Sequence, residues 1–329
     1  MNIKEVQYSP LSSSFTFKAS LENNTAVVRN NLDHVLTTSI EVNETTLTIK
    51  IIDSSVKDFT ELFLITTEYL LGHLPEIKSV KIVNSHNLLL PLYGFEKDSF
   101  SRMEFFQIPS LWHHTTEFSV KPEKWIETNG RAHPQRTAPH EGMVYKRYVP
   151  QLEKTVTFRR LQVEKDLDTF HEWHNQFRVY HFWELNKPKE ELKEYMEKGL
   201  KDPHQFPMIV EIDNELVGYY EMYWVPEDRL GPYYESEAFD RGFHFLIGNK
   251  KFLGYTNTDS IVKSGLHFLY LDDPRTRRIM AEPRSDNQKV LKYAEASIGW
   301  TKLKEFDFPH KRAALLENKR EVFFGGNAL

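Results

Sequence analysis

The segment from residue 243 to 300 most constrains the fold of this chain, because strand and helix patterns alternate there around a glycine-containing loop. The apolar run FHFLI at 243–247 predicts a strand, and two glycines lie in the loop that follows it. Apolar residues then recur at helical spacing from Asn257 to about residue 271, and a second strand is expected near 278–282. A strand, a glycine-containing loop and a helix N-terminus together can hold phosphate on backbone N–H groups.

Composition excludes several classes of function. The chain has 329 residues, which is enough for two domains. It contains no cysteine, and this excludes a disulfide framework, a thiolate nucleophile and a cysteine-ligated metal site. The net charge of −5 gives no field suited to nucleic acid. The sequence shows neither a signal-peptide pattern nor a run of about 20 apolar residues, so a cytoplasmic protein with no membrane segment is expected.

Changes in pattern along the chain predict two domains and a connector. Strand and helix patterns alternate within residues 1–131, where an α/β domain is expected. Residues 132–153 are polar and contain prolines, which is typical of a connector. Residues 154–329 form the second predicted domain. The order strand, helix, strand at 45–95 echoes that of the second domain, so the first domain is interpreted as a degenerate copy of the second.

The second domain begins with a mixed pattern of elements. A strand is predicted at 155–159, and helices are predicted at 166–178 and 189–201. Two β-rich runs at 208–212 and 216–224 flank a short polar turn and predict a hairpin.

Five motifs carry a resemblance to a known family. They are HPQR at 133–136, VYKRYVP at 144–150, HEWHNQFRVYHFW at 171–183, DRGFHFLIG at 240–248 and EPRSDN at 282–287. In this order, over nearly 200 residues, they resemble the GNAT-type acyl-CoA N-acyltransferases. More narrowly, they resemble the siderophore-biosynthesis branch of the aerobactin and alcaligin pathways, which acts on N-hydroxylysine or N-hydroxylated diamines.

The resemblance implies a fold and a mechanism. The fold class is α+β, with a C-terminal GNAT domain (a mixed, splayed central sheet with flanking helices) after a smaller α/β domain. Acetyl-CoA is the implied co-substrate, with its pantetheine arm between two splayed strands and its pyrophosphate on the loop before a long helix. A neutral hydroxylamine nitrogen attacks the thioester directly, without an acyl-enzyme and without a metal.

The loop at 250–257 occupies the position of the family's phosphate-binding motif, Gln/Arg-x-x-Gly-x-Gly/Ala. Lys251, Gly254 and Thr256 take the three motif positions, and only the middle glycine is kept. A plain turn that uses Gly254 is the alternative interpretation. The resemblance implies the following cofactor-binding residues: Phe245, Ile247, Lys251, Gly254, Tyr255, Thr256, Asn257 and Asn287.

Two residues are the catalytic candidates. In a strand, His244 points away from the face of its two phenylalanine neighbours, and the resemblance implies a histidine that faces the cleft and accepts a proton. A buried core histidine is the alternative. The resemblance assigns Asp286 to orienting His244 or the substrate amine, and a helix N-cap is its alternative role. The family's usual tyrosine acid falls on Ala294, one residue from Tyr293, so Tyr293 is left out of the catalytic set.

The resemblance also points to the acceptor. His174, Arg178 and Trp183 are candidates for the acceptor pocket, with amphipathic helix packing as the alternative. A carboxylate clamp from Arg178 would favour hydroxylysine, but the absence of a clear further carboxylate-binding cluster favours a short diamine such as N-hydroxyputrescine.

The function expected from the sequence is acetylation of an N-hydroxylated amine to a hydroxamate. It would be linked to an N-hydroxylating monooxygenase and a siderophore synthetase. Three alternatives remain: N6-hydroxylysine acetylation or succinyl transfer, acyl transfer to a polyamine or aminoglycoside, and a non-catalytic protein that binds coenzyme A or polyamines.

Overall fold

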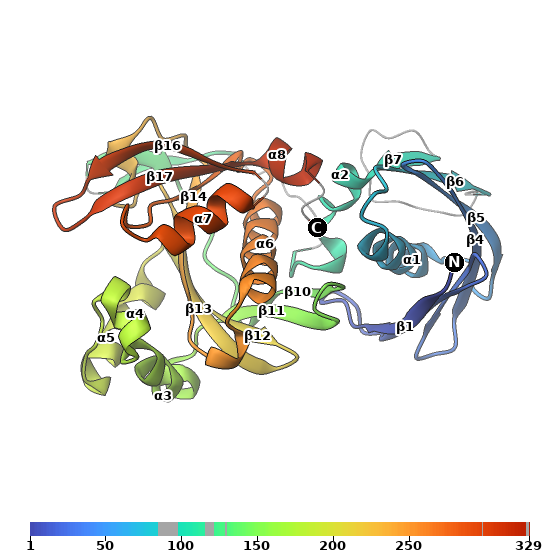
Figure 1. Ribbon diagram of the computed structural model, residues 1–329, viewed down its shortest axis with the longest axis horizontal. Helices are drawn as coiled ribbons and strands as arrows, with labels where there is room; N and C mark the ends of the chain where they lie inside the picture. The colour runs from blue at the N-terminus through green and yellow to red at the C-terminus, as the bar shows by residue number, and fades with distance from the viewer. Residues whose placement is uncertain (85–97, 116–121, 129, 298, 327–328) are drawn as a thin grey trace. The chain divides into compact units, whose positions relative to one another are not determined.

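The computed structural model describes residues 1–84, 98–115, 122–128, 130–297, 299–326 and 329, which fold into two compact units (Figure 1). Unit 1 comprises Met1–Glu117, Arg147–Glu153 and Phe324–Leu329. Unit 2 comprises Phe118–Lys146 and Lys154–Phe323. The end of the predicted first domain and most of the predicted connector therefore belong to unit 2.

The described part of unit 1 contains a seven-stranded sheet whose strands follow one another in chain order. They are β1 (Ile3–Tyr8), β2 (Phe17–Glu22), β3 (Thr25–Asn30), β4 (Val35–Asn43), β5 (Thr46–Ser54), β6 (Ser79–Val83) and β7 (Ser99–Ser101). Strands β1 to β5 pair antiparallel, whereas β5 and β6 are parallel and α1 (Thr60–His73) connects them. The sheet curves around α1 (Figure 1), and this explains why α1 is buried at every position from Leu62 to Leu71. The short helix α2 (Arg102–Phe105) follows β7.

The described part of unit 2 is built on an eight-stranded mixed sheet in the order β10-β11-β12-β13-β14-β15-β17-β16. The strands are β10 (Met143–Val149, which continues into unit 1), β11 (Lys154–Arg160), β12 (Gln205–Ile212), β13 (Glu215–Trp224), β14 (Arg241–Ile247), β15 (Arg278–Ala281), β16 (Trp300–Asp307) and β17 (Arg312–Lys319). A separate two-stranded sheet joins β8 (Trp125–Thr128) to β9 (Arg131–Pro134). The helices are α3 (Val163–His174), α4 (Phe177–Trp183), α5 (Lys189–Lys201), α6 (Tyr255–Asp272), α7 (Gln288–Ala296) and α8 (Arg320–Gly325, which ends in unit 1).

The centre of the unit 2 sheet is splayed. Strands β14 and β15 are parallel neighbours for only two residue pairs, Arg241 with Ile279 and Gly242 with Met280. Within the described residues, the rest of that edge of β14 has no strand partner, whereas its other edge pairs with β13 along its whole length. Helix α6 makes the crossover between the two strands. The mixed, splayed sheet expected from the sequence is thereby confirmed.

Helices α3 and α5 cover the sheet beside β13 and β14. Their apolar faces form a core with Tyr219 and Leu246 of these strands. Trp173 of α3 lies so close to Gly248, the first residue after β14, that a β-carbon at Gly248 would be 2.0 Å from the indole ring. A glycine at this position therefore allows α3 to approach the end of β14.

Most predicted elements of the second domain are present, with two differences. The helix at 189–201 is confirmed as α5, but the single helix predicted at 166–178 is wrong. The chain breaks between α3 and α4, where the side-chain amide of Asn175 donates to the carbonyl of His171 at 2.9 Å. Strands β16 and β17 were not predicted, because β16 is exposed along most of its length and β17 is buried at six consecutive positions, so neither strand shows a regular alternation of buried and exposed residues.

The two units share a sequence of strand pairings. In unit 1, β5, α1 and β6 form a parallel crossover that β7 extends antiparallel. In unit 2, β14, α6 and β15 form a parallel crossover that β17 extends antiparallel. A duplicated core requires such a shared order, and the degenerate copy itself stays a prediction.

Across the described ranges, no helix is long and apolar enough to span a membrane. The same residues hold no group of three or more His, Cys, Asp or Glu side chains arranged for a metal ion.

Candidate functional site

Three neighbouring strands of unit 2 bring an acid, a base and an acid side by side. Glu221 on β13 is the cross-strand partner of His244 on β14. Glu282 follows β15 and lies two residues after Met280, the parallel partner of Gly242, and His244 lies two residues after Gly242. Residues two apart share one face of a strand, so the β13–β14 pairing and the last β14–β15 pair direct all three side chains to the same face of the sheet.

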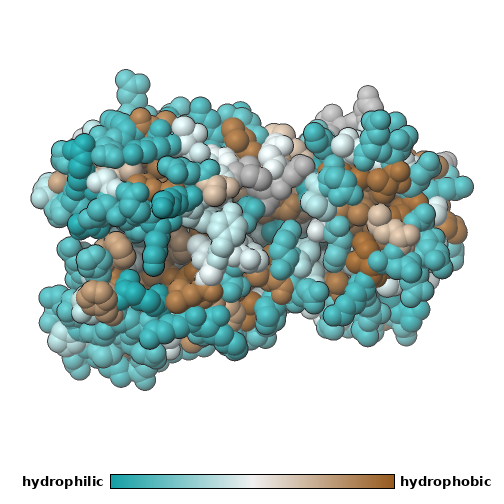
Figure 2. Space-filling model, in the orientation of Figure 1, coloured by the Kyte–Doolittle hydropathy of each residue, from teal (hydrophilic) through white to brown (hydrophobic). Residues whose placement is uncertain are grey.

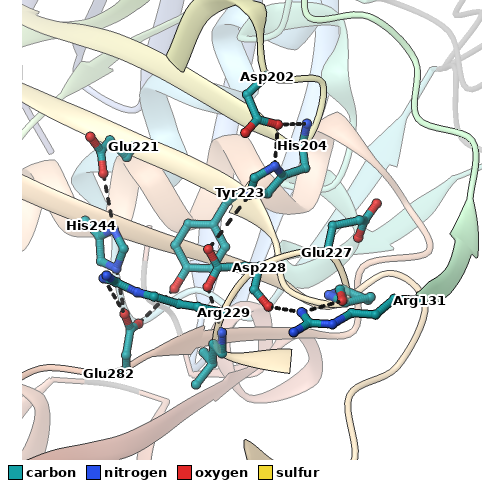
Figure 3. Close-up of polar contacts among 12 residues, drawn as sticks. Arg131, Asp202, His204, Glu221, Tyr223, Glu227, Asp228, Arg229, His244 and Glu282 are labelled. Carbon is teal, nitrogen blue, oxygen red and sulfur yellow. Dashed lines mark hydrogen bonds and ion pairs between the residues drawn. The ribbon is translucent and has the colours of Figure 1, made fainter. Parts of the chain in front are cut away.

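The imidazole of His244 lies between the two carboxylates (Figure 3). Its Nδ1 is 3.3 Å from Oε2 of Glu221, and its Nε2 is 2.6 Å from Oε1 of Glu282. A carboxylate only accepts hydrogen bonds, so the ring donates from both nitrogens when it is protonated. The arrangement therefore favours the imidazolium form.

The pKa values agree with this geometry. Burial lowers the pKa of His244, but the charge of Glu282 and the hydrogen bonds with Glu221 and Glu282 outweigh burial and raise it to about 9. Burial raises the pKa of Glu282, yet the charge and hydrogen bond of His244 hold it well below the usual range. Burial raises the pKa of Glu221, but the hydrogen bond and charge of His244, together with the hydrogen bonds from Tyr195 and Tyr219, lower it overall. At pH 7 the three groups carry one positive and two negative charges.

Three tyrosines complete the hydrogen bonds of the carboxylates. Tyr223 donates to Oε2 of Glu282 at 2.8 Å. Tyr219 donates to Oε1 of Glu221 at 3.1 Å, and Tyr195 of α5 donates to the same oxygen. Burial, followed by the nearby carboxylates, raises the pKa of all three phenols. The tyrosines therefore act as neutral donors that fix the carboxylates in place.

The acid–base–acid row lines a cavity of about 500 Å³. The side chain of His244 is 24% exposed and that of Glu282 is fully buried, so the imidazole is the more accessible group. Aromatic side chains from three segments line the cavity: Trp183, Phe243, Phe245 and Trp300. In the space-filling view, apolar side chains are visible in the recess between α7 and the region of α4 and α5 (Figure 2).

Cations gather on the Glu282 side of this cavity. Arg229 and Lys311 each place a nitrogen 3.8 Å from Oε1 of Glu282, the oxygen that also contacts His244. Lys311 additionally donates to the backbone carbonyl of Glu282 at 2.7 Å. Arg284 also lines the cavity, but its guanidinium is paired with Asp286.

The predicted cofactor-binding residues lie along the splayed edge and the loop after it. Phe245 and Ile247 are on β14, and Phe245 lines the cavity. Gly254 precedes α6 with φ +125°, a backbone conformation reserved for glycine, and nothing lies within 4 Å of the point where a β-carbon would be. Tyr255, Thr256 and Asn257 open α6, where the first N–H groups have no acceptor within the helix.

Two other predicted cofactor-binding residues, Lys251 and Asn287, have side chains that already contact other protein groups. Lys251 is exposed and its Nζ is 2.7 Å from a carboxylate oxygen of Glu215, so its charge is already paired. Asn287 caps α7 by accepting from the N–H of Val290 at 3.4 Å, and it lines the cavity.

Of the three predicted acceptor residues, one lines the cavity. The indole of Trp183 lies 6.3 Å from the ring of His244, edge to face. His174 is fully buried and bonds the carbonyl of Phe170 at 2.9 Å, and burial lowers its pKa to about 4. Arg178 donates to the carbonyl of Gly248 at 2.6 Å. Neither His174 nor Arg178 lines the cavity.

Glu282, and not Asp286, makes the carboxylate contact with Nε2 of His244. The side chain of Asp286 is 67% exposed and pairs with Arg284 at 3.1 Å, so it does not contact His244. The sequence suggested Glu221 only as a possible partner for a substrate ammonium, and it assigned neither Glu221 nor Glu282 to His244. Their signal was an acidic residue in each strand flanking the β14 pattern, which becomes readable once the strand register is known.

Comparisons with known proteins agree on a family of acyltransferases. Residues 162–308 match the family described as acetyltransferase (GNAT) domain. A Schizosaccharomyces pombe protein, provisionally named a lysine N-acyltransferase, is 40% identical over 227 residues, which cover 69% of this chain and 67% of that protein. The N(6)-hydroxylysine O-acetyltransferase of Escherichia coli is 36% identical over 237 residues, covering 71% of this chain and 75% of that protein. A solved structure of an uncharacterised Bacillus halodurans protein superposes with TM-score 0.54 at 27% identity, over 58% of this chain and 98% of that one.

Proposed function

Since the chain belongs to the GNAT acetyltransferase family, we propose that it transfers an acyl group from acyl-coenzyme A to the nitrogen of an N-hydroxylated amino acid. The product is a hydroxamate, a bidentate ligand for iron(III). The observation that carries the proposal is an imidazole that reaches an apolar-walled cavity between two carboxylates. The proposed acceptor is N6-hydroxylysine, because the name of one relative gives it as the substrate.

The acyl donor fits the splayed edge of β14. Beyond Gly242, that edge has no strand partner among the described residues, so its backbone groups are available to pair with an extended pantetheine arm. At the end of the strand, the open space at Gly254 and the N-terminus of α6 suit a pyrophosphate held by main-chain N–H groups. Coenzyme A would therefore be bound by backbone groups more than by side chains, and this agrees with the loss of two of the three motif positions.

The chemistry follows from the weak basicity of a hydroxylamine. The acceptor nitrogen is neutral at pH 7, so it attacks the thioester carbonyl without first losing a proton. The N–C bond forms, the C–S bond breaks, and the electron pair of that bond leaves with the sulfur. The nitrogen releases one proton to His244 in its neutral form, which is the minor form at pH 7, and the thiolate takes up one proton to become the free thiol. Glu221 and Glu282 stabilise the imidazolium formed in this step.

The names of two relatives differ in the acylated atom, one giving nitrogen and the other oxygen. We assign the nitrogen, because acylation there yields the hydroxamate. Siderophore assembly, with a monooxygenase that supplies the hydroxylamine and a synthetase that consumes the product, is the proposed context.

The test uses purified protein, acetyl-CoA and N6-hydroxylysine, with two readouts. Thiol release measures turnover, and the coloured ferric complex reports a hydroxamate, which an O-acetyl product would not form. Lysine serves as the matched acceptor without the hydroxyl group. Thiol release without the ferric colour would refute N-acylation, and equal turnover of lysine would refute specificity for the hydroxylated amine. His244→Ala should lower turnover while thermal stability measured with acetyl-CoA still rises with its concentration.

A further inference from the structure

Three cations converge on one carboxylate oxygen beside the cavity. A single oxygen, Oε1 of Glu282, lies within 2.6 Å of His244 Nε2 and 3.8 Å of both Arg229 and Lys311. Two further carboxylates lie nearby: Glu221 also pairs with His244, and Asp228 lines the same cavity and acts on Lys311. Because Arg229 lies 3.8 Å from this shared oxygen, an anionic group that entered the cavity could form a closer ion pair with Arg229 than Glu282 does.

Arg229 is the cation best placed to meet such a group. Its side chain is 51% exposed, and its contact with Glu282 is an ion pair at 3.8 Å, longer than a hydrogen bond. Guanidinium presents five N–H donors in a planar fork that matches a carboxylate. Lys311 is 13% exposed and bonds the Glu282 carbonyl, so it contributes mainly its charge.

The loop that carries Arg229 is hydrogen-bonded to a segment of unit 2 that is distant in the sequence (Figure 3). Arg131 on β9 donates to the backbone carbonyls of Pro226 and Asp228, the residue before Arg229. Arg136 forms a bidentate pair with Glu227, at 2.5 and 2.8 Å. These contacts order the loop before any ligand binds, so little conformational entropy is lost when Arg229 engages one.

We propose that Arg229, supported by Lys311, binds the α-carboxylate of the acceptor and thereby selects an N-hydroxylated amino acid over the corresponding diamine. This inference rests on the proposed function and names the recognition element of the same site. Arg229 and His244 contact the same oxygen of Glu282, so the carboxylate and the reacting nitrogen bind at neighbouring points of one cavity. Arg178, the sequence candidate for this role, donates instead to the carbonyl of Gly248.

The experiment compares two acceptors that differ only in the carboxylate. N-hydroxycadaverine is N6-hydroxylysine without its α-carboxylate, so every other contact of the reacting arm is preserved. The unsubstituted enzyme should show the higher kcat/KM for N6-hydroxylysine. Arg229→Gln should lower that value about 10- to 100-fold, the range of a hydrogen bond to a charged group. It should lower kcat/KM for N-hydroxycadaverine much less, and Arg229→Lys should restore part of the loss on N6-hydroxylysine.

Each outcome bears on a distinct claim. Equal losses on both acceptors in Arg229→Gln would overturn the inference, as would equal kcat/KM for both acceptors in the unsubstituted enzyme. Absence of hydroxamate from both acceptors would instead overturn the proposed function, and the inference with it. Lys311→Gln is the second variant and should reduce the preference for N6-hydroxylysine in the same direction. The KM for acetyl-CoA and the thermal midpoint, measured for each variant, separate a loss of recognition from a loss of folding.

Discussion

Replacing Glu282 by glutamine removes one negative charge from the site and preserves most of the shape of the side chain. Glu282 is fully buried, and its oxygens meet His244 at 2.6 Å and Tyr223 at 2.8 Å. A glutamine amide retains one acceptor oxygen, so Tyr223 keeps its hydrogen bond if that oxygen takes the position of Oε2. The second position then carries an NH₂ group, which cannot accept from the imidazolium of His244.

The expected effect is a fall in the pKa of His244. Its rise from 6.5 to about 9 corresponds to roughly 3 kcal/mol in favour of the imidazolium, at about 1.4 kcal/mol for each step of one in pKa. Burial opposes the rise, and the charge of Glu282 is the largest of the causes that favour it. Glu282→Gln should therefore lower the pKa of His244 by at least about one, which is about 1.4 kcal/mol.

The raised pKa of His244 should also make the free energy of unfolding depend on pH. Because folding raises the pKa of His244, its pairing contributes stability that is fully present below the unfolded value of about 6.5. This contribution is lost as pH rises through about 9. Urea unfolding of the unsubstituted protein should therefore show a decline in stability across that window, and Glu282→Gln should flatten it.

The assay is a histidine-ring NMR titration, with the resonance of His244 assigned by its loss in His244→Ala. Asp286→Asn is the matched control, because it makes the same chemical change at a side chain that is 67% exposed and does not contact His244. A pKa of His244 that stays near 9 in Glu282→Gln would refute the electrostatic argument. A larger fall in Asp286→Asn would restore Asp286 to the role that the sequence suggested.

Replacing either of two glycines by alanine should destabilise the protein, one through a steric clash and the other through backbone strain. At Gly242 a β-carbon would lie 2.4 Å from the ring of Tyr223, so Gly242→Ala should displace that ring from Glu282 and cost about 1–3 kcal/mol of unfolding free energy, measured in urea. Unchanged stability would contradict the packing argument. At Gly254 a β-carbon meets nothing within 4 Å, but φ is +125°, so Gly254→Ala should cost about 1–3 kcal/mol through backbone strain alone. It should also weaken acetyl-CoA binding in calorimetry, and unaltered affinity would argue against the pyrophosphate site at this loop.

The parts of the fold that could be predicted were those with a strong local period. Helix α5 has apolar residues at helical spacing between charged ones, and its predicted bounds of 189–201 are those observed. Strand β16 is mostly exposed on both faces, so its pairing with β17 is set by tertiary contacts that no local pattern records. At the break between α3 and α4, the side chain of Asn175 donates to the carbonyl of His171 in the last turn of α3, and one such residue is a weak signal in a sequence.

Site residues could be predicted from the alternation within a single strand, but contacts between strands could not, because they depend on how neighbouring strands are aligned. Strand alternation singled out His244, since its side chain leaves the face of its phenylalanine neighbours. Glu221 lies 23 residues away and Glu282 lies 38 residues away in the sequence. Their pairing with His244 requires both the β13–β14 and the β14–β15 registers. The motif resemblance identifies the segment at 282–287 but not which of its acidic residues contacts His244. The sequence therefore pointed to Asp286, whereas the structure has Glu282 in that contact.

A histidine with a pKa near 9 suits an acceptor that needs no prior deprotonation. At pH 7 only about one His244 ring in a hundred is neutral, since each unit of pH below the pKa lowers that fraction about tenfold. If the neutral ring accepts the proton of the attacking nitrogen, kcat/KM for the acceptor should rise with pH and level off near 9. Because Glu282→Gln lowers the pKa of His244, the same limb should level off at lower pH in that variant. A profile that is flat from pH 7 to 9 in both enzymes would assign the imidazolium to holding the acceptor and the proton transfer to another group.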